Sequence, residues 1–95
     1  MSKLRKSARG KDCTLELPGC THDPETTVLA HLRDYENWGI GQKPDDIAAV
    51  YACHVCHDML DNRREFPESE RDLQDWYVAR ALIRTHRQMA EEGLL

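Results

Sequence analysis

The sequence has few aromatic residues and no long apolar stretch. Aromatic side chains make up 6% of the 95 residues, with a single Phe. No run approaches the roughly 20 consecutive apolar residues that a membrane-spanning helix needs. A chain of this length also has no room for a second independent core. These absences exclude a multidomain enzyme and a membrane protein, and we expect one small domain with no membrane partner.

The N-terminal stretch lacks the apolar segment of a secretory signal. MSKLRKSARGKDC is charged and contains no apolar run of roughly 7–15 residues. We therefore expect a cytoplasmic protein whose thiols stay reduced. In a reducing compartment, cysteines act more often as metal ligands than as partners in disulfides. This chain has four: Cys13, Cys20, Cys53 and Cys56.

Charge is distributed unevenly along the chain, whose formal net charge is −4. Residues 12–75 are acidic, whereas residues 1–11 have no acidic residue. A basic arm on an acidic body is typical of nucleic-acid-binding proteins, because mobile cations neutralise phosphates without reading sequence. A merely solvating terminus is the alternative. We predict a basic arm over residues 1–11 and one domain over 12–95. The arm's cations are Lys3, Arg5, Lys6, Arg9 and Lys11.

The local patterns predict an α+β chain. The β-branched stretch 26–32 predicts a strand, 33–46 a loop, and the apolar run 47–52 either a strand or a helix start. Helices are expected over 54–64 and about 69–92, the second with Ser69 as its N-cap.

The second predicted helix has an apolar stripe and a basic face. We expect the stripe to face the core and the basic face, more often than not, to be solvated. The stripe consists of Leu73, Trp76, Ala79, Leu82, Ile83 and Ala90, and the basic face of Arg80, Arg84 and Arg87.

The strongest motif is CHVCH at residues 53–57, taken with the two earlier cysteines. Four thiolates can close a tetrahedral Zn²⁺ site, and metal binding then adds folding energy to a chain with a thin core. The spacing from Cys53 to Cys56 is typical of such sites. The spacing from Cys13 to Cys20 is wider, although the Pro18-Gly19 turn can bring the two sulfurs together. We predict a structural zinc held by all four.

Other interpretations of the same residues stay open. CHVCH also matches the attachment motif of c-type haem, with Met59 and Met89 as axial ligands. That interpretation leaves Cys13 and Cys20 unexplained. A thioredoxin-like redox pair of cysteines is a weaker interpretation, because no βαβ pattern surrounds the motif. Free or buried thiols without a metal are the remaining alternative.

His57, Asp61 and His31 form a second candidate set. On a helix, His57 and Asp61 lie four residues apart on one face, so both can bind one divalent ion. His31 is expected at the end of a strand, where it can deprotonate an attacking water. A strand His opposite a His/Asp-bearing helix is the arrangement of a one-metal phosphodiesterase. A solvated His-Asp face and a core histidine are the alternatives.

Three segments, LAHLR (29–33), KPDDIAAVYACHVCHDMLDNR (43–63) and RKSARGKDCTLELPGC (5–20), resemble a family of small phage and prophage nucleases. That family is placed in the HNH, or ββα-metal, superfamily and is similar to the nuclease domain of a RecA-dependent phage nuclease. The resemblance implies a zinc-stapled ββα-metal core with an added C-terminal helix. It also implies an endonuclease that cuts DNA phosphodiesters in recombination, repair or processing, in a bacterial or phage-infected cell.

The resemblance assigns roles to individual residues. His31 becomes the general base, and His57 and Asp61 become ligands of a catalytic ion. Two positions depart from the pattern: Ala30 stands where HNH sites commonly have a metal ligand, and the middle Asn is absent. Asp46, with Asp45 as an equal candidate, lies in roughly the place of that Asn and can orient His31. With few protein ligands, the ion is expected to be weakly held Mg²⁺ or Mn²⁺.

Two further residues indicate a nucleic-acid substrate. Arg33 shares the strand face of His31 and can hold a phosphate, and Trp38 can stack a base. DNA is the expected partner, with a recombination or replication protein as a second. The rival class is a non-catalytic zinc module that binds DNA or protein, which the departure at Ala30 favours.

Overall fold

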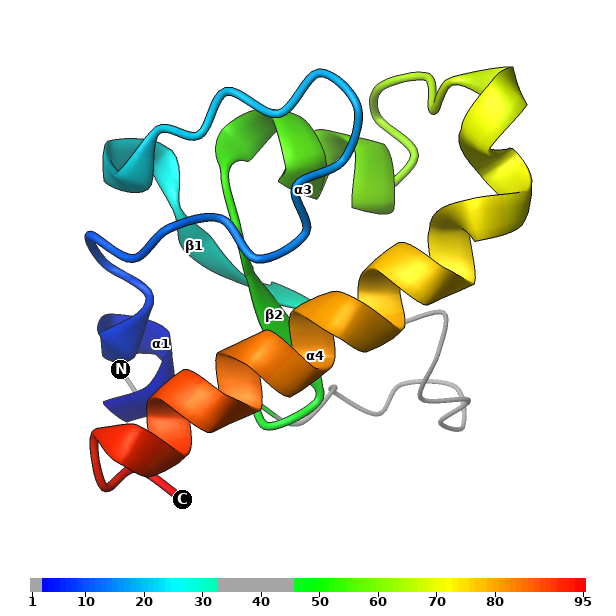
Figure 1. The fold of residues 1–95 in the computed structure, drawn as a ribbon. Coiled ribbons are helices and arrows are strands. Elements are labelled where there is room, and N and C mark those ends of the chain that lie inside the picture. Colours follow the sequence, from blue (N-terminus) through cyan, green and yellow to red (C-terminus); the bar gives the residue numbers. More distant parts are fainter. Residues whose placement is uncertain (1–2, 33–45) are drawn as a thin grey trace, which may run out of the picture.

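The computed structural model describes residues 3–32 and 46–95 of the chain (Figure 1). Arg33, Trp38 and Asp45, and the predicted loop up to residue 45, lie outside the described residues. The described elements are α1 (Lys3–Ser7), η1 (Pro24–Thr26), β1 (Val28–His31), β2 (Ala49–Ala52), α3 (His54–Leu60), η2 (Glu68–Leu73) and α4 (Gln74–Glu91). The chain is therefore α+β, as predicted.

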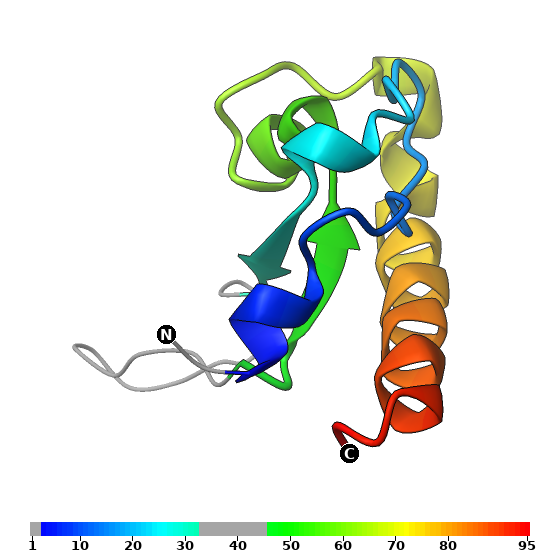
Figure 2. The same cartoon turned by 90° about the vertical axis from the view of Figure 1, so that its left-hand side faces the viewer.

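Strands β1 and β2 form an antiparallel pair in which Leu29 lies opposite Tyr51 and His31 opposite Ala49. All four residues of β2 are buried. A strand buried on both sides gives a continuous apolar run instead of an alternating one, which is why the sequence left strand and helix open at 47–52. Figure 2 shows the reason for this burial: α4 runs along the β2 side of the pair, and β1 lies on the side away from α4.

The two faces of the strand pair belong to different apolar clusters. Successive side chains of a strand point to opposite faces. Leu29 and Tyr51 pack with Ala8, which follows α1, and with Met89 of α4. The alternate residues pack with α3 and the cysteine-bearing segment, in a cluster that includes Ala30, Val50, Val55 and Met59. Residues 29 and 31 of β1 therefore share the face that packs with Ala8, and residue 30 lies on the face toward α3.

The N-terminal segment is folded against the rest of the chain and is not a free basic arm. Residues Lys3–Ser7 form α1, and Ala8 is 1% exposed. The Ser7 hydroxyl lies 2.7 Å from the hydroxyl of Tyr51, and Lys11 forms an ion pair with Glu92 at 2.8 Å. The charge pattern of residues 1–11 could not reveal this packing, because its partners lie more than 40 residues away in the sequence.

The long C-terminal helix forms, but with a different start and a different buried face. A 3-10 segment, η2, precedes α4, and Ser69 is not the N-cap; Pro67 takes that position for η2. Leu73, Trp76 and Ile83 are 45%, 55% and 60% exposed. Ala79 and Ala90 are exposed too, so the predicted stripe is wrong for every member except the half-buried Leu82. The residues that α4 buries are Val78, Ala81, Thr85 and Met89.

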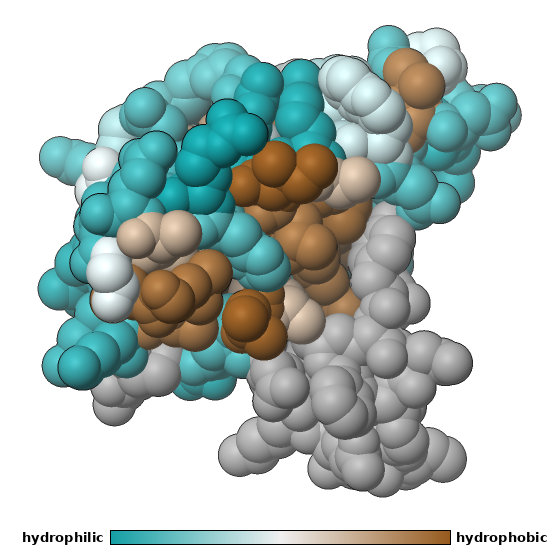
Figure 3. Space-filling model, turned by 60° about the horizontal axis from the view of Figure 1, so that its bottom comes forward, coloured by the Kyte–Doolittle hydropathy of each residue, from teal (hydrophilic) through white to brown (hydrophobic). Residues whose placement is uncertain are grey.

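A polar residue at the centre of that face explains the error. The Thr85 hydroxyl accepts a hydrogen bond from the Tyr51 backbone at 3.1 Å and lies 2.9 Å from the Thr14 hydroxyl. Buried threonine is tolerated when its hydroxyl is paired, so hydrophobicity alone misplaces the face. Trp76 remains outside, 4.8 Å from the guanidinium of Arg80. Figure 3 shows the resulting exposure of apolar residues on the underside of the molecule.

No helix within residues 3–32 and 46–95 combines the length and the apolar character required to cross a membrane.

Candidate functional site

The four cysteines converge on one point. Their sulfur atoms all lie within 4.8 Å of one another, and none forms a disulfide. Cys13, Cys53 and Cys56 are buried, and Cys20 is half-buried. The Cys20 and Cys53 sulfurs are 3.7 Å apart. A tetrahedral Zn²⁺ with Zn–S bonds of about 2.3 Å separates its sulfurs by about 3.8 Å. The donor set and its spacing therefore fit a zinc ion.

Local backbone geometry creates this convergence. Gly19 has a φ of 89°, which a glycine adopts without strain, and the Cys20 amide closes the turn on the Leu17 carbonyl at 2.9 Å. This turn compensates for the wide spacing between Cys13 and Cys20. The other pair lies at the β2–α3 junction, where Cys53 is the N-cap of α3 and Cys56 lies in its first turn.

The thiols of the cluster have strongly shifted pKa values. A hydrogen bond from the Cys56 thiol lowers the pKa of Cys13 to about 5 and raises the pKa of Cys56 far above its usual range. Burial raises the pKa of Cys20 to about 12. Burial also opposes ionisation of Cys53, but hydrogen bonds from Thr21 and the Cys56 backbone outweigh it and lower its pKa. The sulfurs thus share protons, and a dication at their centre would let all four ionise.

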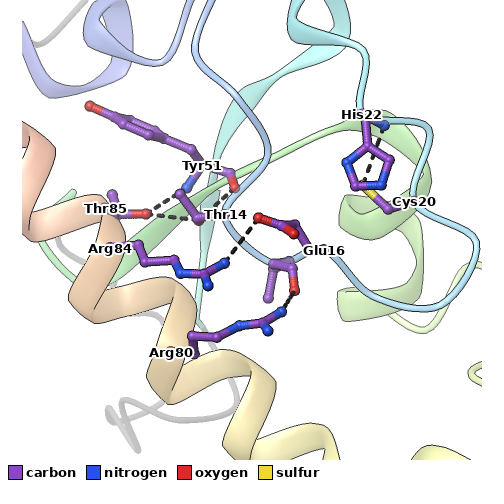
Figure 4. Close-up of polar contacts among 9 residues, drawn as sticks. Thr14, Glu16, Cys20, His22, Tyr51, Arg80, Arg84 and Thr85 are labelled. Atoms are coloured by element: carbon purple, nitrogen blue, oxygen red, sulfur yellow. Dashed lines mark hydrogen bonds and ion pairs between the residues drawn. The ribbon is translucent and has the colours of Figure 1, made fainter.

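Helix α4 braces the segment that carries Cys13. Arg80 donates a hydrogen bond to the Leu15 carbonyl at 3.0 Å, and Arg84 donates to the Glu16 carboxylate at 2.9 Å. The Thr14 hydroxyl donates to the Tyr51 carbonyl at 2.8 Å. Figure 4 shows Arg80 and Arg84 reaching from α4 to the segment before the turn, where Thr14 meets the backbone of Tyr51 in β2. Arg80 and Arg84, which were predicted to lie on a solvated face, therefore stabilise the segment that carries Cys13. The sequence did not indicate these contacts.

His31 and Asp46 form a close pair. Nε2 of His31 lies 2.8 Å from Oδ1 of Asp46, and the two side chains are 15% and 21% exposed. Nε of Arg5 lies 3.3 Å from the same oxygen. Asp46 thus connects the end of β1 with α1. The family resemblance implied that Asp46 or Asp45 contacts His31, but no local signal indicated Arg5, which is 41 residues from Asp46.

A cleft of about 630 Å³ opens beside this pair. Its described lining consists of Arg5, Lys6 and Arg9, followed by Thr27, Val28, Leu29 and His31. Three cations of the N-terminal segment and the candidate base therefore face one space. Such a lining attracts an anionic polymer through its phosphates.

His57 and Asp61 form a second pair, at the end of α3. Nε2 of His57 lies 3.1 Å from Oδ2 of Asp61, and both side chains are less than one-third exposed. Asp61 also accepts a hydrogen bond from Arg63 at 2.7 Å. The imidazole nitrogen and carboxylate oxygen are close enough to contact one ion together.

The candidate residues are not gathered into one compact group. Within residues 3–32 and 46–95, the cysteines form the only cluster of three or more metal-binding groups in close contact. Because side chains alternate between the two faces of a strand, His31 lies on the same face of β1 as Leu29, and Leu29 packs with Ala8. The residue of β1 that packs with α3 is Ala30, which is fully buried.

Comparison with known proteins identifies the family. The sequence model of the family described as "Putative nuclease YbcO" matches residues 2–94. This chain belongs to the YbcO family. The YbcO match includes α1, both strands, the cysteine cluster and α4, so every candidate residue named above lies within it.

Individual relatives agree with this assignment. Proteins named putative nuclease YbcO from Escherichia coli (strain K12) and from Enterobacteria phage 82 are each 47% identical to this chain over 70 residues. Those residues make up 73% of this chain and 73% of each relative. A solved structure, described as a putative bacteriophage protein from Escherichia coli str. K-12 substr. MG1655, superposes with a TM-score of 0.76 at 35% identity. It covers 96% of this chain and 100% of its own.

Proposed function

We propose that this protein is a metal-dependent endonuclease of the HNH type that hydrolyses DNA phosphodiester bonds. The observation that carries the proposal is the His31–Asp46 pair at 2.8 Å, which opens onto a cleft lined by Arg5, Lys6 and Arg9. The YbcO relatives, named as nucleases, support the same class of reaction. We place its action in the cytoplasm of a phage-infected or prophage-carrying cell, in recombination, repair or processing of DNA.

His31 acts as the general base in this proposal. With Asp46 ionised, Nε2 of His31 carries a proton and donates it to Oδ1, which leaves the lone pair of Nδ1 for a water molecule. Asp46 fixes the tautomer and the ring orientation, and it stabilises the imidazolium that forms when the water is deprotonated. The water oxygen then forms a bond to the phosphorus of the DNA strand while the P–O bond to one sugar oxygen breaks, and the leaving oxygen takes a proton from solvent.

The cations of α1 hold the substrate. Arg5, Lys6 and Arg9 line the space beside His31, so they can bind phosphates on either side of the bond to be cut. Arg5 also contacts Asp46, which in turn contacts His31. Arg5 therefore connects the binding of DNA phosphates with the general base. Phosphate contacts of this kind position a strand without reading its sequence.

His57 and Asp61 are assigned to the catalytic ion, Mg²⁺ or Mn²⁺. They lie at the end of α3, whereas His31 lies on the face of β1 that packs with Ala8, so this assignment requires one phosphate to reach both groups. The donor atoms of His57 and Asp61 lie 3.1 Å apart, and water and a DNA phosphate would complete the shell. When bound, such an ion stabilises the charge on the phosphoryl oxygens and the leaving oxygen. The structural zinc is assigned to Cys13, Cys20, Cys53 and Cys56, which join the turn of the N-terminal half to the start of α3.

A non-catalytic DNA- or protein-binding module is the second candidate. It is favoured by Ala30, which is fully buried toward α3 at the position where HNH sites commonly carry a metal ligand. The basic cleft serves binding equally well in this case.

Plasmid nicking separates the two candidates. Zinc-loaded protein is incubated with supercoiled DNA and Mg²⁺, Mn²⁺ or no added divalent ion, and binding is followed in parallel by electrophoretic mobility. The nuclease predicts nicked circles with Mg²⁺ or Mn²⁺ and none when both are left out. Binding without nicking under every divalent ion would select the module instead.

A further inference from the structure

We propose that the hollow after α3 binds a backbone phosphate of the nucleic acid, one that flanks the bond to be cut. The inference rests on the proposed function, and it adds a second phosphate site, away from α1. The hollow has a volume of about 250 Å³. It is lined by Asn62, Arg63, Arg64, Glu65, Phe66, Arg71 and Gln74.

Two separate segments supply the cations of this hollow. Arg63 and Arg64 come from the turn that ends α3, and Arg71 comes from η2. The turn is fixed by its backbone, because the amides of Arg63 and Arg64 both donate to the Asp58 carbonyl, at 2.7 and 3.2 Å. Asn62 supports the tight path with a left-handed φ of 61°. The backbone that carries Arg63 and Arg64 is therefore held by an ordered turn.

The cations outnumber the acidic groups of the lining. Glu65 is the one carboxylate among the residues that line the hollow, against three guanidinium groups. In the part of the chain that the structure describes, Arg64 and Arg71 have no hydrogen-bond acceptor or ion-pair partner for their side chains. A guanidinium group can donate two hydrogen bonds to two oxygens of one phosphate. A phosphate is therefore the ligand that would supply acceptors to both Arg64 and Arg71.

The hollow is connected to the proposed ion site through one residue. Arg63, in its lining, donates to Asp61 at 2.7 Å, and Asp61 lies 3.1 Å from His57. A phosphate held by Arg64 and Arg71 would therefore share Arg63 with the carboxylate assigned to the catalytic ion. A continuous strand carries further phosphates beside the one that reacts, which makes nucleic acid the source favoured over a free phosphate ion.

The test measures DNA binding without cleavage. Affinity of a fluorescent DNA duplex for the zinc-loaded protein is measured by anisotropy without added Mg²⁺ or Mn²⁺ over a series of salt concentrations, for the wild type, Arg64→Ala, Arg71→Ala and the double variant. Arg87→Ala is the matched control: Arg87 is exposed, and helical rise places it about 20 Å from Gln74 along α4. Unchanged zinc content and circular dichroism show that each variant is folded.

We expect the double variant to bind DNA about tenfold more weakly, with a salt slope lower by about one, and the control to bind like the wild type. Wild-type affinity and slope in the double variant would overturn the inference. Inorganic phosphate titrated into the wild type tests the other source: phosphate binding that the double variant loses, with DNA affinity intact, would overturn the nucleic-acid assignment.

The outcomes also separate this inference from the proposed function. Nicking by the wild type together with unaltered DNA binding by the double variant rejects the second phosphate site alone. Weakened binding in the double variant with no nicking by the wild type rejects the nuclease but supports the site. A wild type that does not bind DNA rejects both.

Discussion

Asp46 is the residue on which the candidate site depends most closely, since it contacts both His31 and Arg5. We predict that Asp46→Asn lowers the single-turnover rate of DNA cleavage by about 10- to 100-fold, because the neutral amide no longer stabilises the His31 imidazolium. DNA affinity without added Mg²⁺ or Mn²⁺ should change little, since the lysine and arginine contacts of α1 remain. Asp58→Asn, on α3, is the control and should cleave at the wild-type rate. Equal rates in both variants would remove Asp46 from the mechanism.

The pair at the end of α3 makes a different prediction at the residue scale. His57→Ala and Asp61→Asn should each raise the Mn²⁺ or Mg²⁺ concentration needed for half-maximal cleavage, by about 10- to 100-fold. His54→Ala is the control, because His54 is exposed on the same helix and the contact found for it uses its backbone amide. If neither His57→Ala nor Asp61→Asn changes the metal concentration needed for half-maximal cleavage, the catalytic ion binds elsewhere.

At the scale of elements, α1 is a structural part of the domain and also a source of cations. Removing residues 1–9 should lower the free energy of unfolding by about 1 to 3 kcal/mol, because it deletes the Ser7–Tyr51 hydrogen bond and exposes the apolar surface under Ala8. Urea denaturation of the zinc-loaded protein measures this change. A free arm would leave the midpoint unchanged, and that outcome would contradict the docked helix.

Which elements could be predicted follows from how local their signals are. The strand that became β1 and the helix after CHVCH were predicted because their patterns lie within a few consecutive residues. The docking of α1 and the buried face of α4 were not, because both depend on partners far along the chain, such as the Thr85 contact with Thr14. For the site, sequence spacing suggested the cysteine cluster, and the family resemblance suggested a contact of His31 with Asp46 or Asp45. It could not place His31 and α3 relative to the two faces of the sheet.

At the scale of the whole molecule, the cysteine cluster joins parts of a domain that has a small core. Structural zinc sites contribute about 10–16 kcal/mol of apparent binding free energy, compared with about 5–15 kcal/mol for the stability of a typical domain. We predict that a strong chelator unfolds the protein cooperatively and that zinc restores it, measured by far-ultraviolet circular dichroism. A domain that keeps its spectrum without metal would contradict a folding role for the cluster.

The cluster also makes a prediction about protons. Zinc binding needs four thiolates. The metal-free chain is expected to be unfolded, so its thiols should have ordinary pKa values of about 8.5 and should be largely protonated at pH 7. Zinc should therefore displace close to four protons per chain, and its affinity should fall as the pH falls. Indicator titration in weak buffer measures this number, and a release of two protons or fewer would mean that thiols are already ionised in the metal-free chain.

The most direct test of the central proposal is the single-turnover rate of plasmid nicking by His31→Ala, with His54→Ala as the matched control and equal zinc content in all samples. Loss of the general base should slow cleavage by about 10²- to 10⁴-fold at saturating Mg²⁺ or Mn²⁺, while DNA affinity and folding stay at the wild-type level. The control should cut like the wild type. Cleavage by His31→Ala at the wild-type rate would contradict the assignment of His31 as the base and, with it, the site proposed around the His31–Asp46 pair.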